Sequence, residues 1–92
     1  MSSVEPGFNS DIVHRGMTFH VQTEDWGHSN PFVVTQVYQS GTVVVRVKTP
    51  YVTIHEKSLS QGRLAIRLGM REQHQQILDQ LVSGELLQQR LK

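Results

Sequence analysis

The sequence contains no cysteine, which excludes a disulfide framework, a thiolate zinc site and a cysteine nucleophile. No apolar run approaches the length of about 20 residues that a transmembrane helix needs. Lysine and arginine outnumber aspartate and glutamate by only nine to eight, so the basic excess of a typical nucleic-acid-binding surface is missing. We therefore expect a protein with no membrane span and no nucleic-acid partner.

The first ten residues have no basic start and no apolar run, so they do not resemble a secretory signal. We expect a cytoplasmic protein with a flexible N-terminal arm at 1–10, a single domain at 11–84 and a short helical extension or tail at 85–92. A length of 92 residues leaves room for one small core, which excludes a large multi-step enzyme and makes any oligomer interface important for stability.

Alternation of apolar and polar residues predicts a first β-hairpin. In residues 17–24, Met17, Phe19 and Val21 share one face, as expected for a half-buried strand. A shorter strand at 11–14 precedes it, and Gly16 supplies the conformational freedom for a tight turn between the two.

The strongest strand signals are two runs rich in β-branched residues, 32–39 and 42–49, on either side of Ser40-Gly41. If this dipeptide is a two-residue turn, the register is fixed and Val37 lies opposite Val44. One face is then the core face, formed by Phe32, Val34, Tyr38, Val43, Val45 and Val47. The opposite face combines apolar and charged side chains: Val33, Thr35, Val37, Val44, Arg46 and Lys48.

Residues 61–82 predict a helix that ends at Ser83-Gly84. Apolar residues alternate strictly within 63–70, so this part also fits a strand. The run 72–81 is rich in helix-forming residues, and Met70 continues its helical spacing, which favours one continuous helix.

The chain thus consists of two hairpins followed by a helix. We predict the α+β class: a four-stranded antiparallel β-sheet (two hairpins) followed by one long C-terminal helix packed on one face. The segment 51–60 fits either a short strand extension or a loop, and Ser58 or Ser60 is the expected N-cap of the helix.

No pattern of catalytic or cofactor-binding residues is present in the sequence. The five histidines lack metal-ligand spacing, no glycine-rich phosphate loop occurs, and no serine lies in a nucleophile elbow. Glu24, Asp25 and His28 are close enough in sequence to hold a divalent ion, although acids in such loops more often cap turns. We predict no catalytic residue, no cofactor and no metal, and a protein that is not an enzyme.

The mixed face of the second hairpin is the expected contact surface. An exposed apolar patch promotes association, so we expect a second copy or a partner protein to cover it. Cover by the N-terminal arm or by residues 51–54 of the same chain is the alternative. The predicted interface at this face comprises Val33, Thr35, Val37, Val44 and Arg46.

Two other features point to contacts outside the domain. Arg63, Arg67 and Arg71 follow one another at four-residue intervals, so a helix places them within about 80° of each other. Such a row can bind a carboxylate or phosphate or meet an acidic partner, or it can form a solvated edge. Trp26, the single tryptophan, lies in the loop after 17–24, where it either covers the core or belongs to a contact surface.

The chain contains the run His20–Asp25 (HVQTED), Gly27, Val34-Thr35 and Gly41, together with the helix segment Met70–Leu81 and Gly84. These short motifs resemble a family of short proteins from deltaproteobacteria such as myxobacteria. The chain is also similar, more distantly, to myxobacterial adaptor proteins that control cell polarity with a Ras-like GTPase and a response regulator. The resemblance implies a bacterial signalling role with a small GTPase or response regulator as partner, and it implies no catalytic residue.

The residues and the resemblance together predict a non-catalytic protein–protein interaction or adaptor module that forms a homodimer. The alternative is a regulatory sensor that binds an anionic small molecule, such as a nucleotide, through Arg63, Arg67 and Arg71. A third hypothesis, an enzyme that uses Glu24, Asp25 and His28, requires a bound metal.

Overall fold

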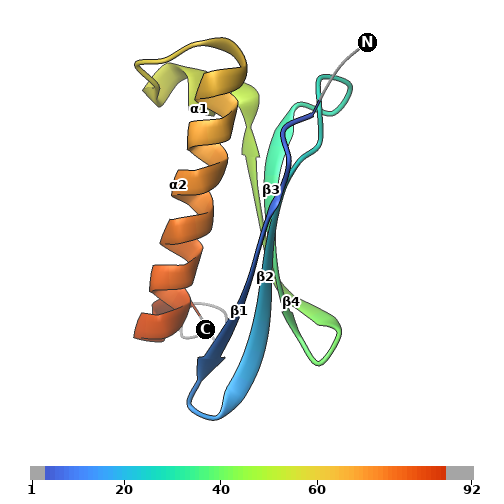
Figure 1. The fold of residues 1–92 in the computed structure, drawn as a ribbon, viewed down its shortest axis with the longest axis vertical. Coiled ribbons are helices and arrows are strands. Elements are labelled where there is room, and N and C mark those ends of the chain that lie inside the picture. Colours follow the sequence, from blue (N-terminus) through green and yellow to red (C-terminus); the bar gives the residue numbers. More distant parts are fainter. Residues whose placement is uncertain (1–3, 87–92) are drawn as a thin grey trace.

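The computed structural model describes residues 4–86. Four strands form one antiparallel sheet in the order β1-β2-β3-β4, and two helices follow (Figure 1). The elements are β1 (Phe8–His14), β2 (Met17–Asp25), β3 (Phe32–Gln39), β4 (Thr42–Pro50), α1 (Tyr51–Lys57) and α2 (Gly62–Ser83). The predicted α+β class, with two hairpins followed by a long helix on one face of the sheet, is confirmed.

Both hairpins turn on two residues with positive φ. The angle is 52° at Arg15 and 77° at Gly16 in the first turn, and 51° at Ser40 and 78° at Gly41 in the second. Two consecutive positive values are typical of the type I′ turn, whose twist matches that of the flanking strands. Both turns therefore lie where the sequence predicts them.

The second hairpin leaves the predicted register after two residue pairs. Tyr38 pairs with Val43 as expected, but a β-bulge follows, and Val37 pairs with Val45 instead of Val44. A bulge places two residues opposite one, so every later pair of the hairpin is shifted by one position. The predicted pairing of Val37 with Val44 is therefore wrong.

The helix α2 packs on the face of β3 that was expected to be exposed. Val33, Thr35 and Val37 each have an exposed fraction of 0%. Val21 of β2 pairs with Val37, and cross-strand partners share a face, so β3 continues the apolar face of β2. The predicted apolar patch is therefore wrong: Val33 and Val37 are core residues, and Val44 packs partly against the core.

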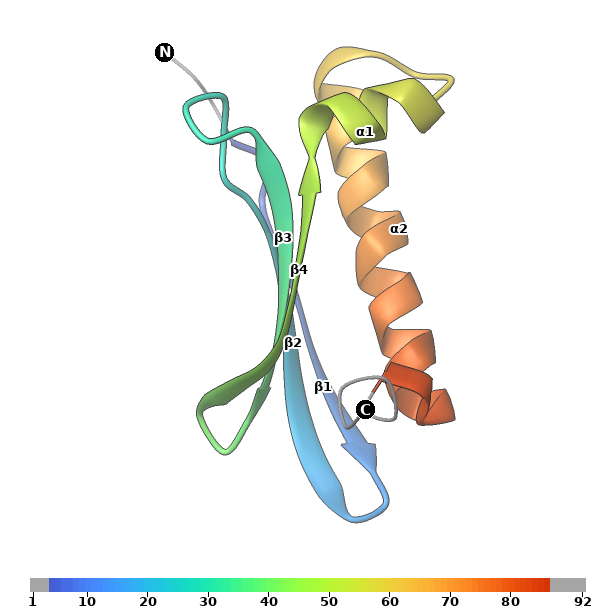
Figure 2. The ribbon, with the colours of Figure 1, turned by 180° about the vertical axis from the view of Figure 1, so that it is seen from behind.

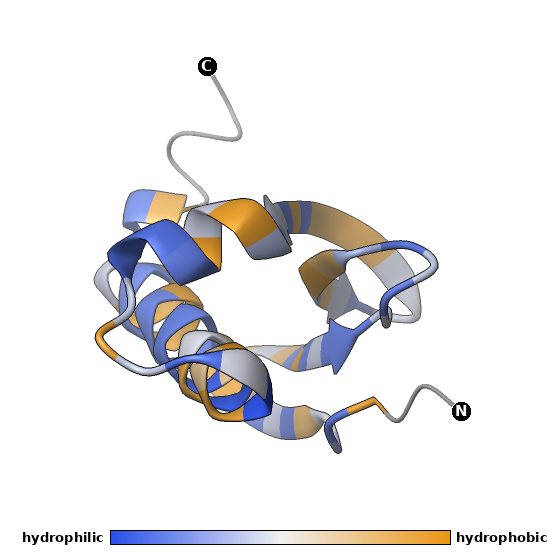
Figure 3. Ribbon diagram, turned by 90° about the horizontal axis from the view of Figure 1, so that it is seen from above, coloured by the Kyte–Doolittle hydropathy of each residue, from blue (hydrophilic) through white to orange (hydrophobic). Residues whose placement is uncertain are grey.

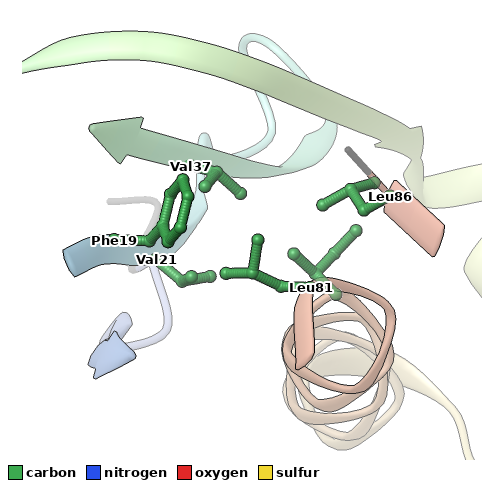
Figure 4. Packing of buried hydrophobic residues seen from close by; sticks show 6 residues of the cluster. Phe19, Val21, Val37, Leu81 and Leu86 are labelled. Atoms are coloured by element: carbon green, nitrogen blue, oxygen red, sulfur yellow. The ribbon is translucent and has the colours of Figure 1, made fainter. Parts of the chain in front are cut away.

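Two apolar clusters fill the space between the sheet and α2, which lie on opposite sides of the core in Figure 3. The first cluster, shown in Figure 4, joins β2 and β3 to the C-terminal half of α2 and consists of Phe19, Val21, Val37, Ile77, Leu81 and Leu86. The second joins β3 and α1 to the N-terminal half of α2 and consists of Val33, Tyr51, Ile54, Ile66 and Met70. Together they hold α2 against the sheet near both of its ends.

A continuous chain of hydrogen bonds crosses the core between these clusters. It connects α2 with all four strands and consists of Ser10, Thr23, Thr35, Thr49, Gln73 and His74, called the polar belt below. Among residues 4–86, no buried side-chain nitrogen or oxygen lacks a hydrogen-bond partner. A shift of α2 along the sheet would break this pairing, so the belt fixes the position of the helix.

The helix α1 starts directly after Pro50, where a short strand or a loop was expected. It packs on α2 at the upper end of the molecule in Figure 2. Gly69 of α2 permits this close approach, because a Cβ atom there would lie 2.8 Å from Cγ2 of Ile54. The glycine inside the helix is therefore explained by packing.

The predicted long helix is confirmed, including the part that also fitted a strand. Its N-cap is Gln61, neither Ser58 nor Ser60. Gly84 ends it with a φ of 82°, and its backbone N–H donates to the carbonyl of Leu81. Neither helix in residues 4–86 combines the length and hydropathy required to cross a membrane. Residues 87–92 of the predicted tail lie outside the described residues.

Candidate functional site

The carboxylate of Asp25, at the end of β2, joins three segments of the chain. Its Oδ2 accepts a hydrogen bond of 2.9 Å from the backbone N–H of Glu5, and its Oδ1 accepts one of 3.0 Å from that of Gly27. The hydroxyl of Tyr51 also donates to Oδ1. Burial and, secondarily, this hydrogen bond raise the pKa of Tyr51. Asp25 therefore fixes the N-terminal segment and α1 to the loop after β2.

The side chain of Glu5 is buried and binds Arg63 of α2. Its Oε2 lies 2.5 Å from Nη2 and 2.9 Å from Nε of the guanidinium. Residues 4–7 therefore dock on the domain, and β1 begins at Phe8, inside the segment expected to be a flexible arm. Arg63 is thus paired, whereas the other two arginines of the predicted row have no partner among residues 4–86.

A cavity of about 120 Å³ lies beside this pair, lined in part by Asp25, His28, Tyr51 and His55. The rings of His28 and His55 meet Tyr51 edge-on, with centroid distances of 5.6 and 6.4 Å. The carboxylates of Asp25 and Glu5 already accept hydrogen bonds from the chain itself. Both carboxylates that line the cavity are thus engaged in hydrogen bonds with other described residues, which supports a structural role for this cluster.

The trio Glu24, Asp25 and His28 does not form a metal site. Glu24 accepts a hydrogen bond from the amide of Gln22, whereas Asp25 binds Glu5 and Tyr51. Within residues 4–86, no three histidine, aspartate or glutamate side chains are placed to hold one metal ion.

Arg46 and Trp26 contact the face of the sheet opposite α2, here called the open face. Nη2 of Arg46 donates to Oε1 of Gln36 at 3.1 Å. Nζ of Lys48 lies 5.1 Å from the centroid of the Trp26 ring and 4.3 Å from that of Phe32. Trp26 therefore packs against Lys48, a residue of β4. Arg46 pairs with Gln36, between Thr35 and Val37, so its side chain lies on the opposite face of the sheet from the valines with which it was expected to form an interface.

The side of α2 that faces away from the sheet carries three exposed large apolar side chains. This outer face comprises Leu64, Arg67, Leu68, Arg71 and Val82. The exposed fractions are 46% for Leu64, 42% for Leu68 and 55% for Val82. Arg67 and Arg71 are exposed and have no hydrogen bond or salt bridge within residues 4–86.

A groove of about 190 Å³ borders the outer face at Leu68. Ile54, Ala65 and Gly69 contribute to its walls, and the exposed Lys57 and Glu72 lie at its rim. The space suits one apolar side chain of a bound molecule, and its charged rim suits a protein more than a uniformly charged ligand.

The outer face was only partly predictable. The row of arginines is visible in the sequence, but Leu64 and Leu68 were not among the predicted interface residues. Two signals identify them: their own four-residue spacing, and the separate set of apolar residues that α2 already buries against the sheet, Ala65, Ile66, Met70, Ile77 and Leu81.

Comparisons of the chain with known protein families, with curated proteins and with solved structures find no match. The predicted resemblance to deltaproteobacterial proteins is therefore neither supported nor contradicted, and the functional assignment depends on the geometry of the chain.

Proposed function

We propose that this protein is a non-catalytic interaction module whose contact surface is the outer face of α2. The observation that carries the proposal is the line of exposed leucines beside two arginines that have no partner within residues 4–86. Exposed apolar side chains next to unneutralised charges are typical of protein-binding surfaces, in which arginine is enriched. An acidic partner fits this surface because it neutralises Arg67 and Arg71.

The sensor hypothesis has less support. Only two of its three arginines are free to bind an anion, because Arg63 is paired with Glu5. Arg67 and Arg71 extend into solvent, and neither lines the cavities described above. A nucleotide site normally encloses most of its ligand, so two exposed arginines on a convex helix suit a macromolecular partner better.

A homodimer through the predicted mixed face lacks its apolar patch, since Val33, Thr35 and Val37 are buried in the core of the chain. Dimerisation and a cytoplasmic location stay predictions. A small GTPase or a response regulator, the partners implied by the resemblance, also remain proposals for the protein that binds the outer face.

Photo-cross-linking tests the proposed surface in the cells that make the protein. Benzoylphenylalanine at position 68 should give a discrete cross-linked product, whereas the same probe at position 18, an exposed threonine on β2, should not. Arg67→Glu/Arg71→Glu should abolish the product at position 68. Equal products at both positions, or none at position 68, would refute the proposal.

A further inference from the structure

Four of the five residues of the outer face of α2 belong to a stripe with coiled-coil spacing. Intervals of four and three residues alternate along it, so the stripe repeats every 3.5 residues on average. Its members are Leu64, Leu68, Arg71, Gln75, Leu78 and Val82, called the heptad stripe below. Leu78 is half-buried, and the other five members are exposed. The stripe runs for about 27 Å along the helix, at a rise of 1.5 Å per residue.

From this spacing we infer that the partner contributes one amphipathic α-helix, which packs lengthwise on the heptad stripe and has glutamate or aspartate along the border that meets Arg67 and Arg71. The inference rests on the proposed function and names the kind of partner. A partner helix of about 20 residues would match the length of the stripe. Side chains at the same 3.5-residue spacing interdigitate between two helices, whereas a strand has no matching repeat.

The charges on the Arg67 and Arg71 border of the stripe select acidic residues on the partner helix. Arg67 and Arg71 are one helical turn apart, about 6 Å along the axis, which equals the rise between acids at i and i+4 of a partner helix. The chain itself shows such an interaction, because Arg63, one turn before Arg67, binds the carboxylate of Glu5.

A second copy of this chain fits the stripe less well. The midpoint of the stripe along the helix axis lies at the level of residue 73. In an antiparallel symmetric pair, the same edges of the two helices face each other. Glu72, exposed beside the centre, would then lie against Glu72 of the second copy. In a parallel pair, Arg71 would meet Arg71. Both arrangements place like charges together, which disfavours self-association relative to an acidic partner.

A pair of synthetic helices tests this inference directly. The probe is a fluorescein-labelled peptide of about 21 residues with leucine at the a and d positions, glutamate along one flanking border and glutamine along the other. Its twin has lysine in place of glutamate. Fluorescence anisotropy should show binding of the acidic peptide, about tenfold or more tighter than that of the basic twin, and weaker at high salt.

Charge reversal distinguishes a specific contact from a general attraction. Arg67→Glu/Arg71→Glu should weaken binding of the acidic peptide about tenfold or more and should create binding of the basic twin. Arg46→Glu carries the same type of charge change on the open face and should leave both affinities unchanged. An equal effect of Arg46→Glu, or equal affinity for both peptides, overturns the inference.

Other outcomes separate this inference from the proposed function. If wild-type protein binds no acidic peptide while cross-linking at position 68 still gives a specific product, the contact surface stands and the helical partner is overturned. A dimer in light scattering that Leu64→Ser/Leu68→Ser converts to a monomer shows that the stripe binds a second copy, which overturns the inference. Binding to anionic phosphatidylserine vesicles in place of the peptide overturns it as well.

Discussion

Nδ1 of His74 lies 2.8 Å from Oγ1 of Thr23, so a side chain of α2 hydrogen-bonds to the centre of the sheet inside the core. Nε2 of the same ring lies 2.9 Å from Oγ of Ser10 on β1. Both ring nitrogens are therefore paired, and the remainder of the polar belt continues from Thr23 to Thr35 and Gln73. The belt positions α2 on the sheet, and with it the direction in which the outer face points.

The burial of His74 predicts that the protein loses stability in weak acid. Burial lowers the pKa of His74, and the nearby His20 lowers it further. In the unfolded chain, His74 takes up a proton below a pH of about 6.5, whereas the folded chain does so only at lower pH. The free energy of unfolding should therefore fall as the pH drops below 6.5, by at most about 1.4 kcal/mol per pH unit from this group, until the pKa of the folded state is reached.

Urea unfolding at several pH values between about 8 and 5 measures this loss. His74→Gln keeps a hydrogen-bonding side chain but cannot be protonated, so its unfolding free energy should vary less with pH. The control His55→Gln changes an exposed histidine and should preserve the wild-type dependence. A wild-type stability that stays flat across the range contradicts the prediction.

Thr35→Val should destabilise the fold although it preserves the shape of the side chain. Thr35 is fully buried, and its hydroxyl is bonded to Thr23 and accepts a hydrogen bond from the amide of Gln73. Valine leaves these buried groups short of a partner, so we expect a loss of about 1–3 kcal/mol in the free energy of unfolding. Thr18→Val, at an exposed position of β2, should change it by less than about 0.5 kcal/mol. Equal effects of the two substitutions would show that the belt does not contribute to stability.

Gly69→Ala should destabilise the protein, against the usual benefit of alanine in a helix, which is about 1 kcal/mol. The added Cβ would lie 2.8 Å from Cγ2 of Ile54, a stiff β-branched side chain in the core. Overpacking of this kind costs about 1–3 kcal/mol. In an Ile54→Ala background the clash is absent, so there Gly69→Ala should stabilise. A double-mutant cycle by urea unfolding checks this reversal of sign, and additive effects would contradict it.

Tyr51→Phe should alter stability in strong alkali. The pKa of Tyr51 is raised in the folded protein, so above a pH of about 10 the unfolded chain releases this proton before the folded one does. The free energy of unfolding of the wild type should therefore fall as the pH rises above 10, and that of Tyr51→Phe should fall less. Tyr38→Phe, a half-buried tyrosine of β3, should retain the wild-type loss. Identical alkaline profiles for wild type and Tyr51→Phe would be the contrary result.

The four strands and α2 could be predicted because their signals are local, whereas α1 was expected to be a strand or a loop. Two positive-φ turns at Arg15-Gly16 and Ser40-Gly41 set the hairpins, and helix-forming residues set α2. The packed face of β3 could not be predicted, because valines occur on both of its faces and hydrophobicity alone does not distinguish them. The pairing of Val21 with Val37 decides it, and this contact depends on the loop between β2 and β3.

The bulge near Val44 could not be predicted from the sequence either, since no glycine marks it. Among the site residues, Arg67 and Arg71 lie on the outer face of α2, as a helical row predicts, and they await a functional test. The sequence could not show that Arg63, unlike Arg67 and Arg71, forms an ion pair, because its partner Glu5 is 58 positions away in the sequence. Long-range pairs of this kind follow from the folded structure and leave no spacing signal.

The central claim is that α2 uses its inner face for folding and its outer face for binding. The most direct measurement compares Leu64→Ser/Leu68→Ser with wild type in both unfolding free energy and affinity for the acidic helical peptide. We predict a stability within about 0.5 kcal/mol of wild type, since both leucines are exposed, and an affinity lower by about tenfold or more. A marked loss of stability with unchanged peptide affinity would contradict the account.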